Sequence, residues 1–377
     1  MAAIQMQMIA QSYLVFDLTG SPALLGLVNS GFAIPMLGLA LFGGALADRL
    51  DRKKIIQIGQ IGFLLTALAV AVTVQMGAVT WYHLFAASMV MGAVFSFIGP
   101  ARQAMIPDLV SRQNLTNAIA LNSAGMSAMT LMAPAFAGVL YATIGPAGVY
   151  LVLAGLGAIS VLVTVMLPKT VQRPMAANAK ILTDIWAGVS YIRRTPMVLI
   201  LLAIGLATAL LAMPFRFLMP IFVVDIYGKG PEAMGLLVSV MGLGALVGSL
   251  FMAQAGRWKR GLLLIATTLL TGVALLLVAL LPFYLVALFL MLALGLGDAG
   301  RRTLNQALIM EVSEDQYRGR VMSVYMLNFA LMPLGVLPAG IVAQYLGGQV
   351  AVGILAVLLL IITVVIFVTQ KDLRRFN

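Results

Sequence analysis

The stretch GGALADRLDRKK, residues 43–54, carries six charged residues among its twelve positions. Only 9% of the 377 residues of the chain are charged, and long apolar runs flank the stretch on both sides. Basic residues gathered between apolar segments are typical of the cytoplasmic loops of membrane proteins. The stretch therefore predicts a cytoplasmic loop that joins two membrane-spanning helices.

The composition agrees with a membrane protein. Hydrophobic residues make up 62% of the chain, whereas a soluble domain carries about a quarter charged residues. The chain has no cysteine, which excludes disulfides, thiol nucleophiles and thiolate metal sites. The sequence contains no P-loop, H-E-x-x-H or G-x-S-x-G motif, so it predicts neither ATP binding nor an enzyme.

Eleven apolar segments are long enough to cross a bilayer, which takes about 20 residues in a helix. A shorter apolar piece, 1–17, precedes them. The expected spans are 22–45, 55–76, 81–100, 115–143, 147–167, 196–225, 232–255, 261–281, 283–306, 320–346 and 348–369.

The loops between these segments alternate in charge. Every Lys and Arg except Arg216 and Lys229 falls on one set of loops and on the C-terminal tail. The positive-inside rule places that set in the cytoplasm, and a bacterial inner membrane is the expected location. We expect anionic lipids, and not nucleic acid, to be the partners of these basic loops. The single histidine, His83, follows Trp81 and Tyr82 and predicts an interfacial belt residue.

The chain repeats itself with an offset of about 202–209 residues. VFDLTGSPALLGL (15–27) recurs as VVDIYGKGPEAMGLL (223–237), and RQAMIPDLV (102–110) recurs as NQALIMEVS (305–313). Two related halves of about six spans are typical of transporters, whose binding site lies between the halves. We expect an N-terminal bundle at 1–167, a C-terminal bundle at 196–377 and a linker at 168–195 that includes an amphipathic helix on the inner leaflet.

The repeat also concerns the start of the chain. The second half has 29 residues between Pro196 and Asp225, whereas the first half has 16 ahead of Asp17. By this comparison Met1 falls about midway through the first span. We therefore expect about 13 or more further residues upstream in the natural protein.

The charged stretch resembles motif A of the major facilitator superfamily, G-x-x-x-D-R-x-G-R-K. Asp51 stands where many members have glycine. AQSYLVFDLTGSP (10–22), GPARQAMIPDLV (99–110), GVSYIRRTP (188–196) and QYRGRVMSV (316–324) are similar to the branch with the enterobactin exporter and macrolide-efflux proteins. The resemblance implies an all-α membrane protein of two six-helix halves, the first helix truncated here. The matching residues of motif A are Gly44, Asp48, Arg49, Arg52 and Lys53.

The resemblance implies that Asp48 helps to latch the two halves in the outward-open state. A carboxylate at a helix end can also bind a neighbouring helix N-terminus or simply cap a turn. The corresponding stretch of the second half, AQAGRWKR (253–260), has Ala253 in place of the acid, so any latch is one-sided.

The stretch APAFAG (133–138) resembles the antiporter motif G-P-x-x-x-G of the same superfamily. Pro134 and Gly138 match, while Ala133 replaces the first glycine. The resemblance implies export; ordinary close packing of small residues is the alternative.

Charges inside the spans are the strongest site candidates, because a charge in the bilayer is costly. Arg216 predicts contact with substrate or coupling ion, or else a structural ion pair. Asp298 is the first candidate for the proton carrier, because desolvation favours the neutral form of a carboxyl group. Arg301 and Arg302 are spaced to pair with it, so a local salt bridge is the alternative. Further acids at helix ends that could carry the proton are Asp17 and Asp225.

Five uncharged polar residues within the spans are expected to line the substrate path or, alternatively, to join helices through hydrogen bonds. They are Gln7, Gln11, Asn29, Asn122 and Asn328. GLGDAG (295–300) fits a dinucleotide-binding pattern, but it lies inside a span with no strand before it, so we expect no such site.

These features together predict a secondary transporter that exports a small amphiphilic compound, such as a drug-like molecule or a siderophore, in exchange for protons. Its expected partners are the substrate, protons and anionic lipids, without a cofactor or metal, and the expected state is a monomer. The alternatives are an uptake transporter, a non-transporting membrane scaffold and a membrane enzyme.

Overall fold

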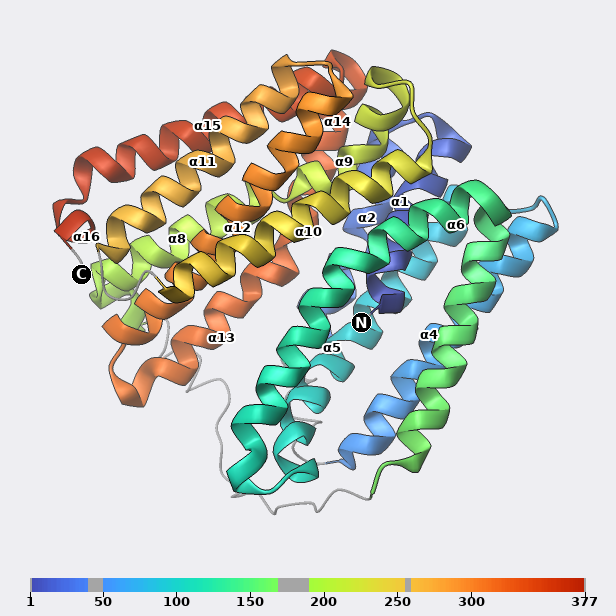
Figure 1. Cartoon of the computed structure of the whole chain (residues 1–377), viewed down its shortest axis with the longest axis horizontal. Helices are drawn as coiled ribbons and strands as arrows, with labels where there is room; N and C mark the ends of the chain where they lie inside the picture. The colour runs from blue at the N-terminus through green and yellow to red at the C-terminus, as the bar shows by residue number, and fades with distance from the viewer. Residues whose placement is uncertain (1, 40–49, 169–189, 255–258, 376–377) are drawn as a thin grey trace. The chain divides into compact units, whose positions relative to one another are not determined.

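A computed structural model describes residues 2–39, 50–168, 190–254 and 259–375. Helices joined by turns account for this part of the chain, and it contains no strand (Figure 1). Gly44, Asp48 and Arg49 of the motif-A stretch lie outside the described residues, as does most of the amphipathic helix expected at 181–194.

The chain forms two compact units, of which the first contains residues 1–176 and 228–239. Within it, α4 packs against both α5 and α6, and α1 packs against α6. Gly145 has a positive φ of 71°, so the long helix α6 is two spans that meet at this residue. The elements of this unit are α1 (Ala2–Thr19), α2 (Pro22–Ser30), α4 (Arg52–Gln75), α5 (Trp81–Leu109), η1 (Arg112–Asn114) and α6 (Leu115–Met166).

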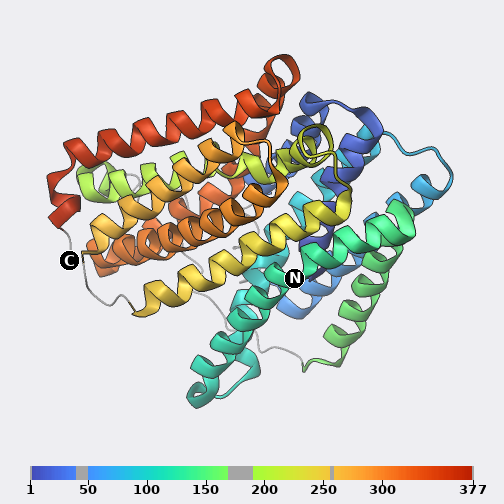
Figure 2. The same ribbon diagram turned by 45° about the horizontal axis from the view of Figure 1, so that its top comes forward.

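The second unit contains residues 177–227 and 240–377. Figures 1 and 2 show α15 alongside α11, which also packs against α12. The helix α10 (Pro231–Gln254) belongs to both units, since its first residues group with the first one. The other elements are α8 (Pro196–Leu211), α9 (Pro214–Ile221), η2 (Phe222–Ile226), α11 (Arg260–Leu280), α12 (Tyr284–Val312), α13 (Asp315–Leu331), η3 (Met332–Gly335), α14 (Val336–Leu346), α15 (Gly348–Thr369) and α16 (Lys371–Arg375).

The expected spans are present as helices as far as the described residues extend, and residues 40–45 of the span expected at 22–45 lie outside them. In the described part of the chain, nine helices are long and apolar enough to cross a membrane. One of them covers two expected spans, 115–143 and 147–167, and the span expected at 320–346 consists of α13, η3 and α14. Many large apolar side chains of these helices are exposed, as a lipid environment requires.

The span expected at 196–225 differs from a single straight helix. It breaks after α8, continues as α9 from Pro214 and ends in the π-helical turn η2. Proline has no N–H and clashes with the preceding turn, which explains the break. The amide of Met213 compensates by donating to the Thr208 carbonyl oxygen at 3.3 Å, five residues back.

The repeat seen in the sequence has a backbone counterpart. Gly20 and Gly228, 208 residues apart, follow the first span of each half and have positive φ angles of 57° and 58°. Gly145 and Gly347, 202 residues apart, have φ angles of 71° and 87°. Glycine adopts this left-handed region without steric cost, so the matched turns explain these four glycines.

The end of the linker packs onto the second unit. The ring of Tyr191 stacks on that of Tyr317 with centroids 4.3 Å apart, and the Tyr191 hydroxyl accepts a hydrogen bond from the Glu314 amide at 3.0 Å. Ile192 is buried in the hydrophobic core of this unit. We still propose the division of the chain into bundles at 1–167 and 196–377, with the linker between them.

Candidate functional site

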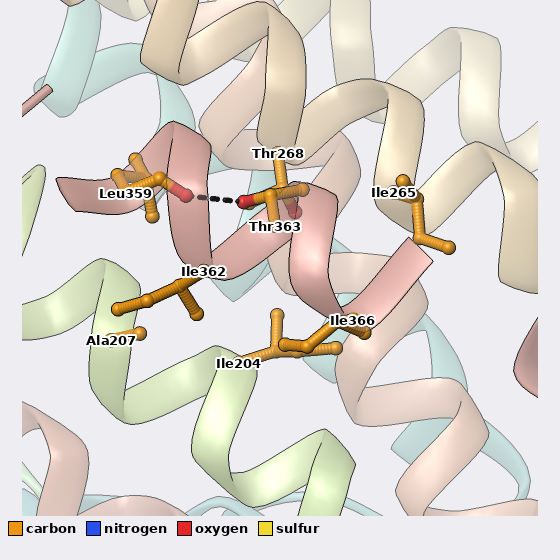
Figure 3. Close-up of a pocket in the computed structure, with 8 residues that line it drawn as sticks. All are labelled: Ile204, Ala207, Ile265, Thr268, Leu359, Ile362, Thr363 and Ile366. Carbon is orange, nitrogen blue, oxygen red and sulfur yellow. Dashed lines mark hydrogen bonds between the residues drawn. The ribbon is translucent and has the colours of Figure 1, made fainter. Parts of the chain in front are cut away.

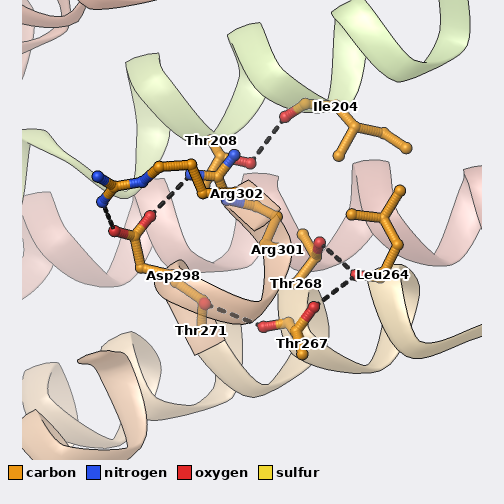
Figure 4. Close-up of polar contacts among 9 residues, drawn as sticks. All are labelled: Ile204, Thr208, Leu264, Thr267, Thr268, Thr271, Asp298, Arg301 and Arg302. Carbon is orange, nitrogen blue, oxygen red and sulfur yellow. Dashed lines mark hydrogen bonds and ion pairs between the residues drawn. The ribbon is translucent and has the colours of Figure 1, made fainter. Parts of the chain in front are cut away.

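Three charged residues of α12 lie together in the second unit (Figure 4). Arg301 Nη2 donates to Asp298 Oδ1 at 2.7 Å, and Arg302 Nη2 donates to the other carboxylate oxygen, Oδ2. The side chains of Asp298 and Arg301 are 5% and 6% exposed, whereas that of Arg302 is 43% exposed. The local salt bridge predicted from the spacing is therefore present. A proton that binds Asp298 removes the negative charge that pairs with both arginines. The role of Asp298 as proton carrier stays a prediction.

Arg216 contributes to the electrostatic environment of these three residues. It lies half-buried in α9, just after the break in the span, and interacts electrostatically with Asp298 and Arg302. The four side chains comprise three cations and one anion. An excess of positive charge among membrane-spanning helices attracts an anionic group, because few mobile ions can reach it.

Small residues bring α11 and α12 close together beside Asp298. A Cβ on Gly300 would lie 2.7 Å from the Thr267 side chain, and a Cβ on Gly297 would clash with Thr271. The hydroxyls of Thr267 and Thr271 donate to carbonyl oxygens of their own helix (Figure 4). The glycines of GLGDAG therefore serve helix packing, and the threonine hydroxyl protons are already used.

The two other candidate acids are exposed. Asp17 lies near the end of α1, where its Oδ2 is 3.5 Å from the hydroxyl oxygen of Tyr141 on α6. Tyr141 also packs edge-on against Tyr13. Asp225 lies in the π-helical turn η2. Neither acid has the burial of Asp298, and both remain candidates for the proton carrier.

Polar residues of the first unit join helices to one another. Gln11 Nε2 of α1 donates to Ser88 Oγ of α5 at 2.5 Å. Ser12 Oγ donates to Asn29 Oδ1 at 3.2 Å, and Asn29 Nδ2 donates to the carbonyl oxygen of Leu25 at 2.9 Å. Gln11 and Asn29 therefore make the interhelical contacts expected as the alternative to lining a path.

The remaining polar candidates differ in their surroundings. Gln7 is buried on α1. Asn122 of α6 accepts a hydrogen bond from Arg102 Nη2 of α5 at 2.8 Å. Asn328 of α13 lies in the second unit, and its Nδ2 has no hydrogen-bond partner among the described residues.

The described part of the motif-A stretch joins the start of α4 to the ends of α5 and α6. Asp51 Oδ1 caps α4 by accepting a hydrogen bond from the Lys53 amide at 3.0 Å. Arg52 Nη1 donates to Asp108 Oδ2 at 2.7 Å and to the Ala104 carbonyl oxygen at 2.8 Å, both on α5. Lys53 Nζ donates to the carbonyl oxygens of Val165 and Leu167 at the C-terminal end of α6, where a cation is favourable.

The antiporter-like stretch packs closely against the first part of α10. A Cβ on Gly138 would lie 2.5 Å from the Pro231 carbonyl oxygen, and a Cβ on Gly235 would lie 2.5 Å from the Pro134 carbonyl oxygen. Ser239 Oγ accepts a hydrogen bond from the Ala135 amide at 3.0 Å. The small residues therefore permit a close helix crossing, and their link to export stays a prediction.

Sequence reasoning missed Asn305, which lies one helical turn beyond Arg301 on α12 and is fully buried. From the sequence alone, Asn305 is notable only because it aligns with Arg102 in the repeat. The spacing could have identified Asn305, because Asp298, Arg301 and Asn305 share one face of an α-helix.

A small cavity between α8, α11 and α15 is apolar (Figure 3). Its two polar side chains, Thr268 and Thr363, donate to the carbonyl oxygens of Leu264 and Leu359 in their own helices. This cavity offers no free donor to a polar substrate. Its lining residues are Ile204, Ala207, Ile265, Thr268, Leu359, Ile362, Thr363 and Ile366.

The sequence matches the family described as Major Facilitator Superfamily over residues 1–334 and 204–376. Macrolide efflux protein A of Streptococcus pyogenes is 26% identical over 355 residues, which cover 90% of this chain and 86% of that protein. The staphyloferrin A transporter of Staphylococcus aureus is 25% identical over 360 residues, which cover 93% of this chain and 88% of that protein.

Solved structures agree on the fold. The crystal structure of a mutant of the nucleoside transporter NupG has a TM-score of 0.81 at 14% identity. The match covers 98% of this chain and 100% of that chain.

Proposed function

The chain belongs to the major facilitator superfamily, and from this premise we propose that it is a proton-coupled exporter of a small amphiphilic compound. It is a secondary transporter and a multi-pass membrane protein, as the family and its helices establish. Because the members of this family are transporters, the chain is not an enzyme. The substrate class, the direction of transport and the coupling ion are the parts of this function that we propose.

The group of four charges in the second unit carries the proposal. Asp298, Arg301 and Arg302 are held together on α12, and Arg216 interacts with two of them. Ionisable residues within membrane-spanning segments mark substrate and proton pathways. Asp298 is the proposed proton carrier and Arg216 the proposed contact for an anionic part of the substrate, with Asp17 and Asp225 as further candidate acids.

Export is supported by the relatives. A macrolide efflux protein resembles this chain over most of both lengths, which favours an outward-moving drug-like molecule. The relative named as a staphyloferrin A transporter supports a siderophore. The name of this relative does not give a direction of transport, so uptake is the second candidate. In the proposed orientation, the basic loops and the C-terminus lie on the cytoplasmic side of a bacterial inner membrane, where the loops contact anionic lipids. The proposed state of the protein is a monomer.

The test is transport into membrane vesicles of known sidedness. Inverted vesicles that contain the protein are loaded to an acidic interior, and uptake of radiolabelled erythromycin and staphyloferrin A is followed. Export predicts accumulation of one compound that collapses when nigericin removes the pH gradient. Accumulation only in right-side-out vesicles would establish uptake instead. Equal movement in vesicles without the protein would refute both directions for these compounds.

A further inference from the structure

A second polar feature of α12 lies one turn beyond the ion pairs. The Asn305 side chain is 0% exposed, and neither its Oδ1 nor its Nδ2 has a hydrogen-bond partner among the described residues. Within the same described part of the chain, Arg301 Nε and Asn328 Nδ2 are buried and also lack a partner. Four polar atoms of three side chains are thus shielded from solvent without a hydrogen bond.

Two of these atoms, the amide nitrogens of Asn305 and Asn328, converge on α8. A Cβ on Gly205 would lie 2.7 Å from Asn328 Nδ2 and 3.1 Å from Asn305 Nδ2. The side chain of Tyr325 borders the same point at 3.4 Å. Arg301 and Asn305, four residues apart on α12, share one helix face. The absence of a side chain at Gly205 therefore lets two helices direct amide groups to one place on a third.

A purely structural role does not explain this arrangement. A buried amide without a partner destabilises a protein, whereas an apolar side chain of similar shape does not. Asn29 shows the structural use of an amide, because both its Oδ1 and its Nδ2 are hydrogen-bonded. Arg102, the residue aligned with Asn305 in the repeat, is also hydrogen-bonded, to Asn122. Asn305 and Asn328 instead carry unused hydrogen-bonding capacity.

The unused groups are mostly donors. Arg301 Nε and the two amide nitrogens are N–H donors, and Asn305 Oδ1 is the one acceptor among the four atoms. Asp298 accepts a hydrogen bond from Nη2 of Arg301, and the Nε–H of this guanidinium has no partner among the described residues. The charge nearby is positive, since Arg301 and Arg302 outnumber Asp298. Donors and positive charge together suit an anion with oxygen acceptors.

We propose that Arg301, Asn305 and Asn328 bind an anionic oxygen group of the transported solute, a carboxylate or a similar oxyanion. This proposal rests on the proposed transport function and specifies the chemistry that its substrate must carry. The solute supplies the acceptors that the amides lack, so the packed arrangement of α8, α12 and α13 becomes more favourable when loaded than when empty. A transporter that must not close without cargo gains selectivity from this difference.

The test uses benzoate as the probe and benzamide as its uncharged counterpart of the same shape. The melting temperature of the purified full-length protein in detergent is measured with each compound, up to 50 mM. Benzoate is expected to raise it by about 3 °C or more, because a ligand that binds only the folded state stabilises it. Benzamide is expected to raise it much less.

Asn305→Leu separates a binding role from a structural one. It should raise the melting temperature of the ligand-free protein and remove the shift caused by benzoate. Asn328→Leu is the second variant, with the same expectation, should the first fail to fold. Asn29→Leu is the matched control, because its amide is hydrogen-bonded: it should lower the melting temperature and keep the benzoate shift.

The proposal is overturned if benzoate and benzamide act alike on the natural protein, or if benzoate has no effect. It is also overturned if Asn305→Leu and Asn328→Leu lower the melting temperature and keep the shift. Binding in detergent does not depend on transport. A benzoate shift without transport in vesicles would therefore retain the anion site and reject export of the two compounds used. Transport without a benzoate shift would retain export and reject the anion site.

Discussion

Arg52 at the start of α4 pairs with Asp108 near the end of α5, with 2.7 Å between Nη1 and Oδ2. The second unit has the same pair, because Arg260 at the start of α11 lies 2.9 Å from Glu311 near the end of α12. The offsets of 208 and 203 residues agree with the repeat, in which Asp108 and Glu311 are aligned. Each unit therefore ties two consecutive spans together with an arginine at the start of one helix and an acid near the end of the next.

The two pairs should differ in strength. The side chain of Asp108 is 17% exposed and that of Glu311 is 41% exposed, so solvent screens the second pair more. Arg52 also donates to the Ala104 carbonyl oxygen. We expect Arg52→Gln to cost about 1–2 kcal/mol and Arg260→Gln less than about 1 kcal/mol. Melting curves of the detergent-purified variants provide the comparison, and an equal loss for both would contradict it.

Much of the fold could be predicted because hydropathy and charge reflect the bilayer directly. Apolar segments gave the spans, and the matched glycines and ion pairs agree with the repeat. The break at 212–213 was not predicted, although Pro214 is visible in the sequence. A proline in a spanning helix can be tolerated when its neighbours satisfy the freed backbone groups, and those neighbours are known only from the fold.

The candidate site was predictable in part. Charges inside spans are rare, so Asp298 and Arg216 stood out from the sequence alone. Asn305 did not, because it lies next to the predicted end of its span, 283–306, and the sequence does not show that it is buried. Its meaning depends on whether its atoms find partners, and that depends on Gly205 and Asn328 from other helices. Sequence spacing shows which residues share a helix face but not what the face meets.

The crossing of α6 and α10 provides a prediction about stability. A Cβ on Gly138 would lie 2.5 Å from the Pro231 carbonyl oxygen, which belongs to backbone and cannot rotate away. Gly138→Ala is expected to destabilise the protein by roughly 1–3 kcal/mol, the usual effect of overpacking. Gly155→Ala on α6 is the control, because nothing lies within 4 Å of its Cβ position. A melting temperature that falls equally in both variants would show that the crossing is not specific.

The orientation can be tested by labelling, since the chain has no cysteine. Met76 is 74% exposed just after α4, and Asp372 is exposed in α16 near the C-terminus. In intact cells a membrane-impermeant maleimide should label Met76→Cys and leave Asp372→Cys unlabelled. The same reagent applied to inverted vesicles should give the opposite pattern. Labelling of Asp372→Cys in intact cells would reverse the proposed orientation.

Asp298 provides the prediction in which stability and coupling must be separated. Asp298→Asn leaves Arg301 buried without its ionic partner, which should cost about 3–5 kcal/mol. Its melting temperature should therefore fall well below that of Arg302→Gln, because Arg302 is 43% exposed and better solvated. If Asp298 carries the proton, Asp298→Asn should also lose accumulation driven by a pH gradient while it still equilibrates substrate down a concentration gradient.

The two effects of Asp298→Asn can be told apart by using only the folded fraction. Variant protein that elutes as a single species is reconstituted, and its transport is compared with that of Arg302→Gln at equal protein content. Equilibration without accumulation identifies Asp298 as part of the coupling. Accumulation against a gradient with the natural pH dependence would leave Asp298 as the partner of two arginines only. Asp17 and Asp225 would then be the acids to replace, and because both are exposed, their substitution by asparagine should leave the melting temperature nearly unchanged.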